Sequence, residues 1–232
     1  MKNQFVYLIF SLLILASCKG KDKKEIPFIA PKDADIVAPC KSEGAKNGFE
    51  FWDYLGYAPQ TQIPNLTLMD LSGKPVEFYK VLKENKPLVL ISGSYTCDLT
   101  RKNLPAIESF YQKYSSKIAI YFVYTTEAYP KDADAYTIGS EKRFSRENVE
   151  AHIEAVQPKT FGERKALAQK WVKELNIKVP VLLDNPANQF WNYFGQAPNM
   201  AYLIKPNGMV VEKEIWLEMN KFERAVQQLI SK

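Results

Sequence analysis

The chain has 232 residues, of which 46% are hydrophobic and 25% are charged, and its formal net charge is +5. These proportions are typical of a globular protein with a buried core and exclude a disordered chain. Lysine and arginine are scattered among acidic residues without a basic stripe. A nucleic-acid partner is therefore not expected, although the positive surplus suits an anionic membrane surface.

The first 17 residues have the composition of a secretory leader. One positive charge, Lys2, precedes an apolar run from Phe5 to Leu15 that is too short to span a bilayer as a helix. The small residues directly before Cys18 resemble the lipobox of bacterial lipoproteins. We therefore predict a lipoprotein signal peptide over residues 1–17, lipidation of Cys18, and anchoring in the cell envelope with the domain outside the cytoplasm. A plain secretory leader and a signal anchor are the alternatives.

A tether is predicted between this leader and the folded part of the chain. Charged residues and glycine follow Cys18, and a proline-containing stretch that includes Cys40 comes next. Such residues cannot bury enough apolar surface to fold. We therefore expect a flexible, lipid-anchored tether over residues 18–45 and a folded domain over residues 46–232. The aromatic residues 47–57 are expected to pack a short helix or turn on that domain.

Strand and helix patterns alternate from residue 59 onward. Strands are expected where apolar residues alternate or run uninterrupted between turn signals, and helices where they recur at spacings of three and four. The predicted strands cover 63–71, 75–78, 87–92, 117–124, 179–183, 200–204 and 209–216. The predicted helices cover 79–85, 99–114, 161–175, 188–194 and 218–230.

The order of these elements predicts an α/β domain with three layers, α/β/α, around a mixed central sheet. The first two strands are expected to form an N-terminal β-hairpin, and the last two strands a second hairpin. Residues 125–160, which lack a convincing strand pattern, are predicted to be an insert. No internal repeat and no second domain are indicated.

Cys97 is the candidate nucleophile. It lies between an apolar run typical of a central strand and the start of a helix. Ligands gather at the carboxyl ends of strands in open α/β sheets, and a helix N-terminus favours negative charge. Both effects are expected to lower the pKa of the Cys97 thiol, and Thr96 adds a hydroxyl beside it. A buried structural cysteine is the alternative.

The residues around Cys97 resemble the active-site loop of the iodothyronine deiodinase family. That loop has the form Gly-Ser-Cys-Thr-selenocysteine, and residues 93–97 are Gly-Ser-Tyr-Thr-Cys, with Cys97 at the selenocysteine position. Residues 120–130 are similar to the family's Ile-Tyr-Ile-Glu-Glu-Ala-His-Pro segment. The resemblance covers residues 60–230. It implies a thioredoxin-like fold, related to peroxiredoxins, and reductive chemistry by one chalcogen nucleophile.

Three departures from the family bear on the reaction. Tyr129 and Pro158 stand where the family has histidines that resemble proton donors or substrate contacts, and Tyr95 replaces its cysteine. The resemblance therefore does not extend to the groups that would assist removal of iodine from a phenol. Glu127 and Tyr129 are the candidate acid/base groups near Cys97, with Glu127 preferred. The alternative to these acid/base roles is structural: Glu127 caps a turn and Tyr129 packs on the surface.

Other residues have two interpretations. Pro198 lies near the place where thioredoxin-like folds have a cis-proline opposite the active cysteine, so a cis or a trans bond is expected there. Arg101 and Lys102 either stabilise a Cys97 thiolate or form a solvated helix face. The lone histidine, His152, is expected in a solvated helix. The sequence has no Gly-rich phosphate loop and no Cys/His cluster, so neither a cofactor nor a metal is predicted.

Three functions are consistent with these features. The first is a membrane-tethered thiol oxidoreductase or peroxidase in which Cys97 forms a sulfenic acid or mixed disulfide that another thiol resolves. The second is a reductive dehalogenase with the same nucleophile, and the third is a non-catalytic binding module of the cell envelope. The resolving thiol is Cys40 or, as we favour, an external reductant such as a thioredoxin-like protein or a small thiol.

Overall fold

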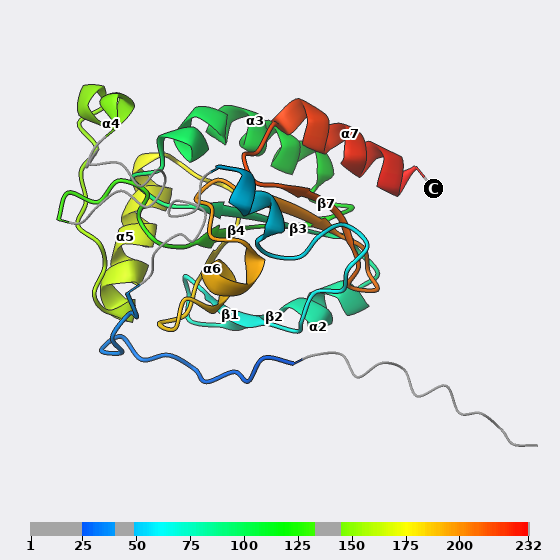
Figure 1. Cartoon of the computed structure of the whole chain (residues 1–232), viewed down its shortest axis with the longest axis horizontal. Helices are drawn as coiled ribbons and strands as arrows, with labels where there is room; N and C mark the ends of the chain where they lie inside the picture. The colour runs from blue at the N-terminus through cyan, green and yellow to red at the C-terminus, as the bar shows by residue number, and fades with distance from the viewer. Residues whose placement is uncertain (1–24, 40–48, 133–144, 232) are drawn as a thin grey trace, which may run out of the picture.

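The structure is a computed structural model that describes residues 25–39, 49–132 and 145–231. The predicted signal peptide, the lipidation site Cys18 and the second tether cysteine Cys40 lie outside these residues. Within the described residues, the chain folds into helices on both faces of one sheet (Figure 1). The predicted three-layer α/β/α class is therefore confirmed.

The middle layer is a seven-stranded mixed sheet with the order β2-β1-β5-β4-β3-β6-β7. Strands β3, β4 and β5 run parallel, and the remaining pairs are antiparallel. Both predicted hairpins, β1–β2 and β6–β7, are present. The strands are β1 (Thr67–Asp70), β2 (Pro75–Glu77), β3 (Leu88–Gly93), β4 (Ala119–Tyr124), β5 (Val181–Leu183), β6 (Ala201–Ile204) and β7 (Val210–Glu214).

Helices form the two outer layers. α3, α5 and α7 cover one face of the sheet, and η1, α2 and α6 cover the other, as the two groups of buried side chains show. Helices α3 and α7 lie side by side over the sheet (Figure 1). The helices are η1 (Phe49–Tyr54), α2 (Phe78–Lys83), α3 (Asp98–Tyr114), α4 (Arg146–Glu150), α5 (Phe161–Glu174), α6 (Gln189–Phe194) and α7 (Met219–Ile230).

Strand β3 shows why the sheet needs helices on both faces. Val89 and Ile91 pack under α3, α5 and α7, while Leu88 and Leu90 point to the opposite face and pack with α2 and α6. All four side chains are fully buried. Burying a side chain of this size contributes about 1.5–3 kcal/mol, so an apolar run without polar alternation is stable only in a central strand. The end of β3 is consequently a rigid support for the loop that follows.

The predicted tether is not free of the domain over its described part. In residues 25–39, the Val37 N–H donates to the Lys159 carbonyl at 2.8 Å, and the Ala38 N–H donates to the Pro186 carbonyl at 2.7 Å. The Asn188 side-chain amide donates in turn to the Ala38 carbonyl at 2.6 Å. We expected a flexible segment over residues 18–45. The described residues instead lie along the domain, because the loops of the domain supply partners for their backbone.

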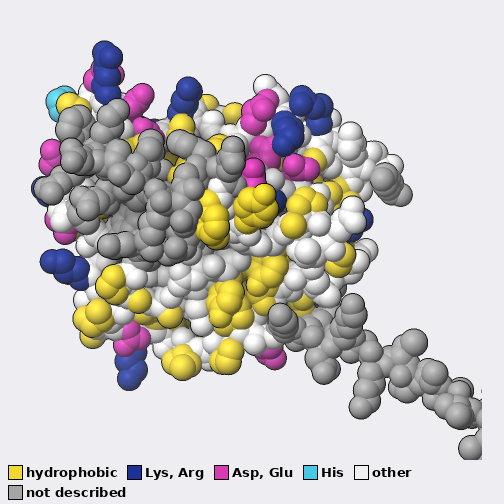
Figure 2. Space-filling model, in the orientation of Figure 1, with side chains coloured by type: hydrophobic (Ala, Val, Ile, Leu, Met, Phe, Trp, Pro, Cys, Tyr) yellow, Lys and Arg dark blue, Asp and Glu magenta, His cyan; other side chains and the backbone are white. Residues whose placement is uncertain are grey.

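The described parts of the predicted insert contain one short helix, α4, and lack a strand. Acidic and basic side chains are interspersed on the described surface of the face shown in Figure 2. Among the described residues, none of the helices is both long enough and apolar enough to cross a membrane.

Candidate active site around Cys97

Cys97 sits where the sequence pattern predicted it, between the end of β3 and the start of α3. It is the N-cap residue of α3, with an extended backbone, and its Sγ accepts a hydrogen bond from the Thr100 N–H at 3.4 Å. The loop reaches this position tightly, because a Cβ on Gly93 would lie 3.0 Å from the Thr100 methyl group. Glycine at the last position of β3 therefore lets the first turn of α3 pack against the strand.

The prediction that the pKa of the Cys97 thiol is lowered is wrong in this structure. The side chain is only 1% exposed, and burial raises the pKa of the Cys97 thiol to about 11, although hydrogen bonds from Thr100 oppose the rise. The nearby carboxyls of Asp98 and Glu127 raise it further. The helix N-terminus is present as expected, but desolvation of the thiolate outweighs it. Cys97 is therefore a protonated, protected thiol in this conformation.

Glu127 holds the loop that carries Cys97. It is fully buried, and its Oε2 accepts hydrogen bonds from the Thr96 N–H at 2.8 Å and from the Thr96 hydroxyl at 2.7 Å. Its Oε1 accepts a hydrogen bond from the Tyr124 hydroxyl, which itself accepts from the Tyr95 N–H at 3.3 Å. Burial raises the pKa of the Glu127 carboxyl, against these hydrogen bonds. The structure thus brings Glu127 and Thr96 together directly beside Cys97.

Thr96 is the centre of a wider polar cluster. Its hydroxyl accepts from the Tyr129 N–H at 3.0 Å, and its carbonyl accepts from the Asn148 side-chain amide at 2.7 Å. Tyr129 therefore meets the loop through its backbone, while its side chain lines a separate hollow. Asn148 is buried, although it belongs to α4 in the insert. The cluster fixes the orientation of the peptide that precedes the Cys97 sulfur.

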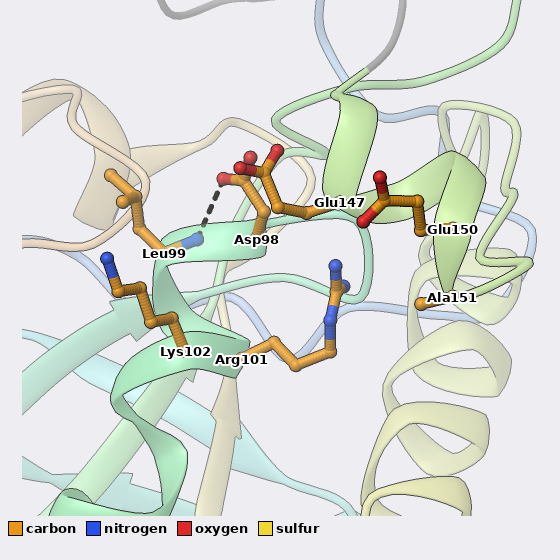
Figure 3. Close-up of a pocket in the computed structure, with 7 residues that line it drawn as sticks. All are labelled: Asp98, Leu99, Arg101, Lys102, Glu147, Glu150 and Ala151. Atoms are coloured by element: carbon orange, nitrogen blue, oxygen red, sulfur yellow. Dashed lines mark hydrogen bonds between the residues drawn. The ribbon is translucent and has the colours of Figure 1, made fainter.

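Arg101 points from the first turn of α3 toward the neighbouring helix α4 (Figure 3). One terminal nitrogen of its guanidinium donates to Asn148 Oδ1 at 2.8 Å. Arg101 and Lys102 line a hollow of about 440 Å³ between the first turn of α3 and α4, together with the carboxylates of Asp98, Glu147 and Glu150 (Figure 3). The Arg101 contact that the structure gives is thus with Asn148.

The Pro198 peptide bond is trans, because no cis peptide bond occurs among the described residues. The cis alternative is therefore wrong. The loop is held without it, since the Ser92 hydroxyl donates to the Ala197 carbonyl at 2.7 Å and accepts from the Met200 N–H at 2.8 Å. The Pro198 carbonyl accepts a hydrogen bond from the Thr100 hydroxyl at 3.3 Å. This loop does lie opposite the first turn of α3, as expected.

Tyr95, at the family's cysteine position, turns away from Cys97. Its side chain is buried, and its hydroxyl donates to Glu174 of α5 at 2.6 Å. His152 lies just past α4, with a left-handed backbone (φ 53°), rather than within a helix. It lines a hollow of about 380 Å³ with the Tyr129 side chain. The chain's one histidine thus shares a cavity with the tyrosine that replaces a family histidine.

Three residues of the site escaped the sequence interpretation. Tyr124 is the last residue of β4 and lies three positions before Glu127. This short spacing was the signal from which their contact could have been predicted. Thr100 follows Cys97 by three positions, which places it one helical turn further on. Asn148 had no local signal, because its contact with Thr96 spans 52 residues.

Among the described residues, there is no cluster of three or more His, Cys, Asp or Glu side chains that could hold a metal ion. Three layers around a mixed sheet, with a cysteine as the N-cap of the helix that follows a central strand, define a thioredoxin-like fold. Residues 5–213 match the family model described as iodothyronine deiodinase. The chain belongs to the iodothyronine deiodinase family.

Solved structures share the fold at low sequence identity. A thiol:disulfide interchange protein from Bacteroides sp. has a TM-score of 0.52 and 18% identity, over 75% of this chain and 91% of that chain. A proposed protein disulfide isomerase from Bacteroides thetaiotaomicron has a TM-score of 0.51 and 20% identity, with the same coverage of 75% and 91%. A proposed thiol:disulfide interchange protein DsbE from Chlorobium tepidum has a TM-score of 0.51 and 16% identity, over 76% and 98%. A comparison with curated proteins finds no match.

Proposed function

We propose that the chain is a membrane-tethered thiol oxidoreductase or peroxidase with Cys97 as its nucleophile. The observation that carries this proposal is the placement of the Cys97 sulfur at the first turn of α3, where the Thr100 N–H donates to it at 3.4 Å. Glu127 and Thr96 hold the peptide on the other side of the sulfur. Membership of a family that uses one chalcogen nucleophile at this position supports the same role.

The proposed reaction passes two electrons from thiols to an oxidant. The Cys97 thiolate attacks one oxygen of a peroxide, the O–O bond breaks, and a sulfenic acid and an alcohol or water result. A thiol then attacks the sulfenic sulfur and releases water, which leaves a mixed disulfide. A second thiol attacks this disulfide, releases Cys97 as a thiolate and leaves as part of a new disulfide. A disulfide substrate enters the same sequence at the mixed disulfide.

In the proposed cycle, the buried form of Cys97 is the resting state of the enzyme. A thiol that is 1% exposed, and whose pKa burial raises to about 11, is protected from adventitious oxidation. In the proposed cycle, the co-substrate binds when the loop around Cys97 opens, and hydration of the sulfur then lowers its pKa. Glu127, whose carboxyl pKa burial raises, is the proposed proton donor to the leaving oxygen or sulfur, acting through the Thr96 hydroxyl.

An external thiol is proposed to resolve the intermediate, either a thioredoxin-like protein or a small thiol. Treating the full chain with hydrogen peroxide and glutathione, followed by peptide mass mapping, tests this. We expect glutathione on Cys97 and no bridge between Cys40 and Cys97, and Cys97→Ser is the control for peptide assignment. A Cys40–Cys97 bridge would instead make Cys40 the resolving thiol. An unmodified Cys97 would overturn the proposal and favour a non-catalytic binding module of the cell envelope.

The membrane tether is proposed from the leader sequence, with Cys18 as the lipidated residue and the domain outside the cytoplasm. Labelling expressing cells with a palmitate analogue tests the anchor. We expect label in the wild-type chain and in Cys40→Ala, and none in Cys18→Ala, because acylation requires the Cys18 thiol. Equal labelling of wild type and Cys18→Ala would remove the anchor from the proposal.

Reductive dehalogenation is the second candidate function. The family match supports it, as does the hollow of about 380 Å³ that Tyr129, Lys131 and His152 line. Pockets of this size accept small organic ligands, and an iodinated phenol would find a hydroxyl and two basic groups there. The reaction replaces iodine by hydrogen with two electrons from thiols and one proton. Iodide release that depends on Cys97 would establish this activity.

A further inference from the structure

We propose that Thr100 is a positioning residue that makes Cys97 a one-thiol centre, because it occupies the place of the second sulfur in a Cys-x-x-Cys pair. Cys97 is followed by Asp98, Leu99 and Thr100, so the spacing is that of such a pair with the second cysteine replaced. This inference rests on the proposed use of Cys97 as a nucleophile and adds which residue sets its reactivity and its mode of release.

Thr100 touches the Cys97 sulfur from one turn further along α3. Its N–H donates to Sγ at 3.4 Å, and its side chain is fully buried beside the same atom. Gly93 leaves room for the Thr100 methyl group, which would lie only 3.0 Å from a Cβ at that position. The side chain is thus held against the sulfur by the strand behind it.

The Thr100 hydroxyl has one hydrogen and several acceptors within reach. It lies 3.3 Å from the Pro198 carbonyl and 3.5 Å from Asn199 Oδ1, both long for hydroxyl hydrogen bonds. The Thr100 side chain also opposes the rise in the pKa of the Cys97 thiol that burial causes. A thiolate is a stronger acceptor than either oxygen, because it carries the full negative charge. The hydroxyl therefore turns to the sulfur when Cys97 is ionised and returns to Pro198 when the sulfur is in a disulfide.

Threonine at position 100 also affects how the mixed disulfide on Cys97 is broken. The Cys97 thiolate attacks a disulfide RS–SR, whose S–S bond breaks, and RS⁻ leaves with the electron pair. In a Cys-x-x-Cys pair, the second thiol then attacks the Cys97 sulfur and expels the other half. A hydroxyl cannot do this. Cys97 is the one cysteine of residues 25–39, 49–132 and 145–231, so none of the described residues supplies a second thiol, and the proposed external thiol breaks the mixed disulfide.

The first test measures alkylation of Cys97 by iodoacetamide against pH, with peptide mass mapping on the full chain. In Thr100→Val, loss of the donor raises the apparent pKa by about one unit, which leaves about tenfold less thiolate below the midpoint. The more basic thiolate of the variant is about threefold more nucleophilic, which partly offsets its smaller ionised fraction. We therefore expect alkylation about three- to fourfold slower than in wild type. Thr100→Ser restores the wild-type profile, and Thr100→Ala, which also lacks the hydroxyl, repeats the loss if Thr100→Val folds poorly.

Thr125→Val is the matched control. Thr125 is also a buried threonine near the end of β4, and its hydroxyl has no hydrogen-bond partner within the described chain. Its replacement removes the same group without touching Cys97, so the alkylation profile should match wild type. A Thr100→Val profile that coincides with those of wild type and Thr125→Val would overturn the positioning role of Thr100.

The second test adds the missing sulfur. With glutathione disulfide, we expect the wild-type chain to accumulate glutathione on Cys97. Thr100→Cys should instead lose two hydrogens, form a disulfide between Cys97 and the thiol introduced at position 100, and keep no glutathione. Accumulation of the adduct in Thr100→Cys to the wild-type level would show that position 100 is not the resolving position. If wild-type Cys97 reacts with neither reagent, the proposed function fails, which is a different outcome from a variant that matches wild type.

Discussion

Replacing Cys97 with serine is expected to abolish thiol-dependent turnover while the fold stays intact. Serine presents an alcohol that is not ionised at neutral pH, and removal of a nucleophile lowers turnover on the order of a thousandfold or more. Stability should be unchanged or slightly higher, because Cys97 is the N-cap of α3 and serine is a favoured N-cap residue. The loss would therefore be chemical rather than structural.

The measurement compares three chains in two assays. Peroxide consumption with a small thiol as reductant reports the oxidoreductase, and iodide release from iodotyrosine or iodothyronine reports the dehalogenase. Cys40→Ser is the matched control, and we expect it to keep wild-type peroxide turnover. Iodide release by the wild type but not by Cys97→Ser would add the second activity. Peroxide turnover that survives in Cys97→Ser would contradict the assigned nucleophile.

Replacing Glu127 with alanine is expected to have the second largest effect, on stability as well as on turnover. The side chain accepts the Thr96 N–H, the Thr96 hydroxyl and the Tyr124 hydroxyl, and all of these groups are buried. Each buried donor left without an acceptor costs about 1–3 kcal/mol. We therefore expect the free energy of unfolding to fall by about 3 kcal/mol or more, as measured by urea denaturation.

Glu127→Gln separates the charge of the side chain from its shape. Because burial raises the pKa of Glu127 above its ordinary value of 4.5, the folded protein holds this proton at pH values where the unfolded chain has lost it. The contribution of Glu127 to stability therefore declines as the pH rises above about 4.5. Glutamine cannot ionise, so this decline should be absent from the variant.

The urea-denaturation comparison is made across pH on wild type and Glu127→Gln. Burial also raises the pKa of Asp184, but Asp184 is present in both chains and cancels in the difference. Glu150→Gln, a substitution on the exposed face of α4, is the control for removal of a carboxylate from the surface. A difference between wild type and Glu127→Gln that stays constant with pH would contradict the raised pKa.

Local patterns predicted most of the secondary structure. The uninterrupted run that became β3 and the three-and-four spacing that became α3 depend on neighbours within a few positions, so they are visible in the sequence. The contacts between the predicted tether and the domain were not visible in the sequence. The described residues of the tether gain backbone partners such as Lys159 and Pro186, which are more than 100 positions away. No pattern within residues 25–39 reports such partners.

The site was predicted in part for the same reason. The location of Cys97 at a strand-to-helix junction followed from local pattern. Glu127 was expected near Cys97, but its hydrogen bonds to Thr96 were not predicted. The raised pKa was missed because it depends on how completely distant segments exclude water from the sulfur. Asn148 was missed because its buried amide comes from the insert.

The amino-acid sequence alone determined the layered α/β class, the family and the position of Cys97 at the start of a helix, since hydrophobic periodicity and short motifs act over a few residues. The tertiary structure decided that Cys97 is buried and protonated, that Thr100 and Glu127 support it from two sides, and that Pro198 is trans. Solvation and hydrogen bonding depend on which remote segments meet, and the free energy of a buried thiolate depends on both.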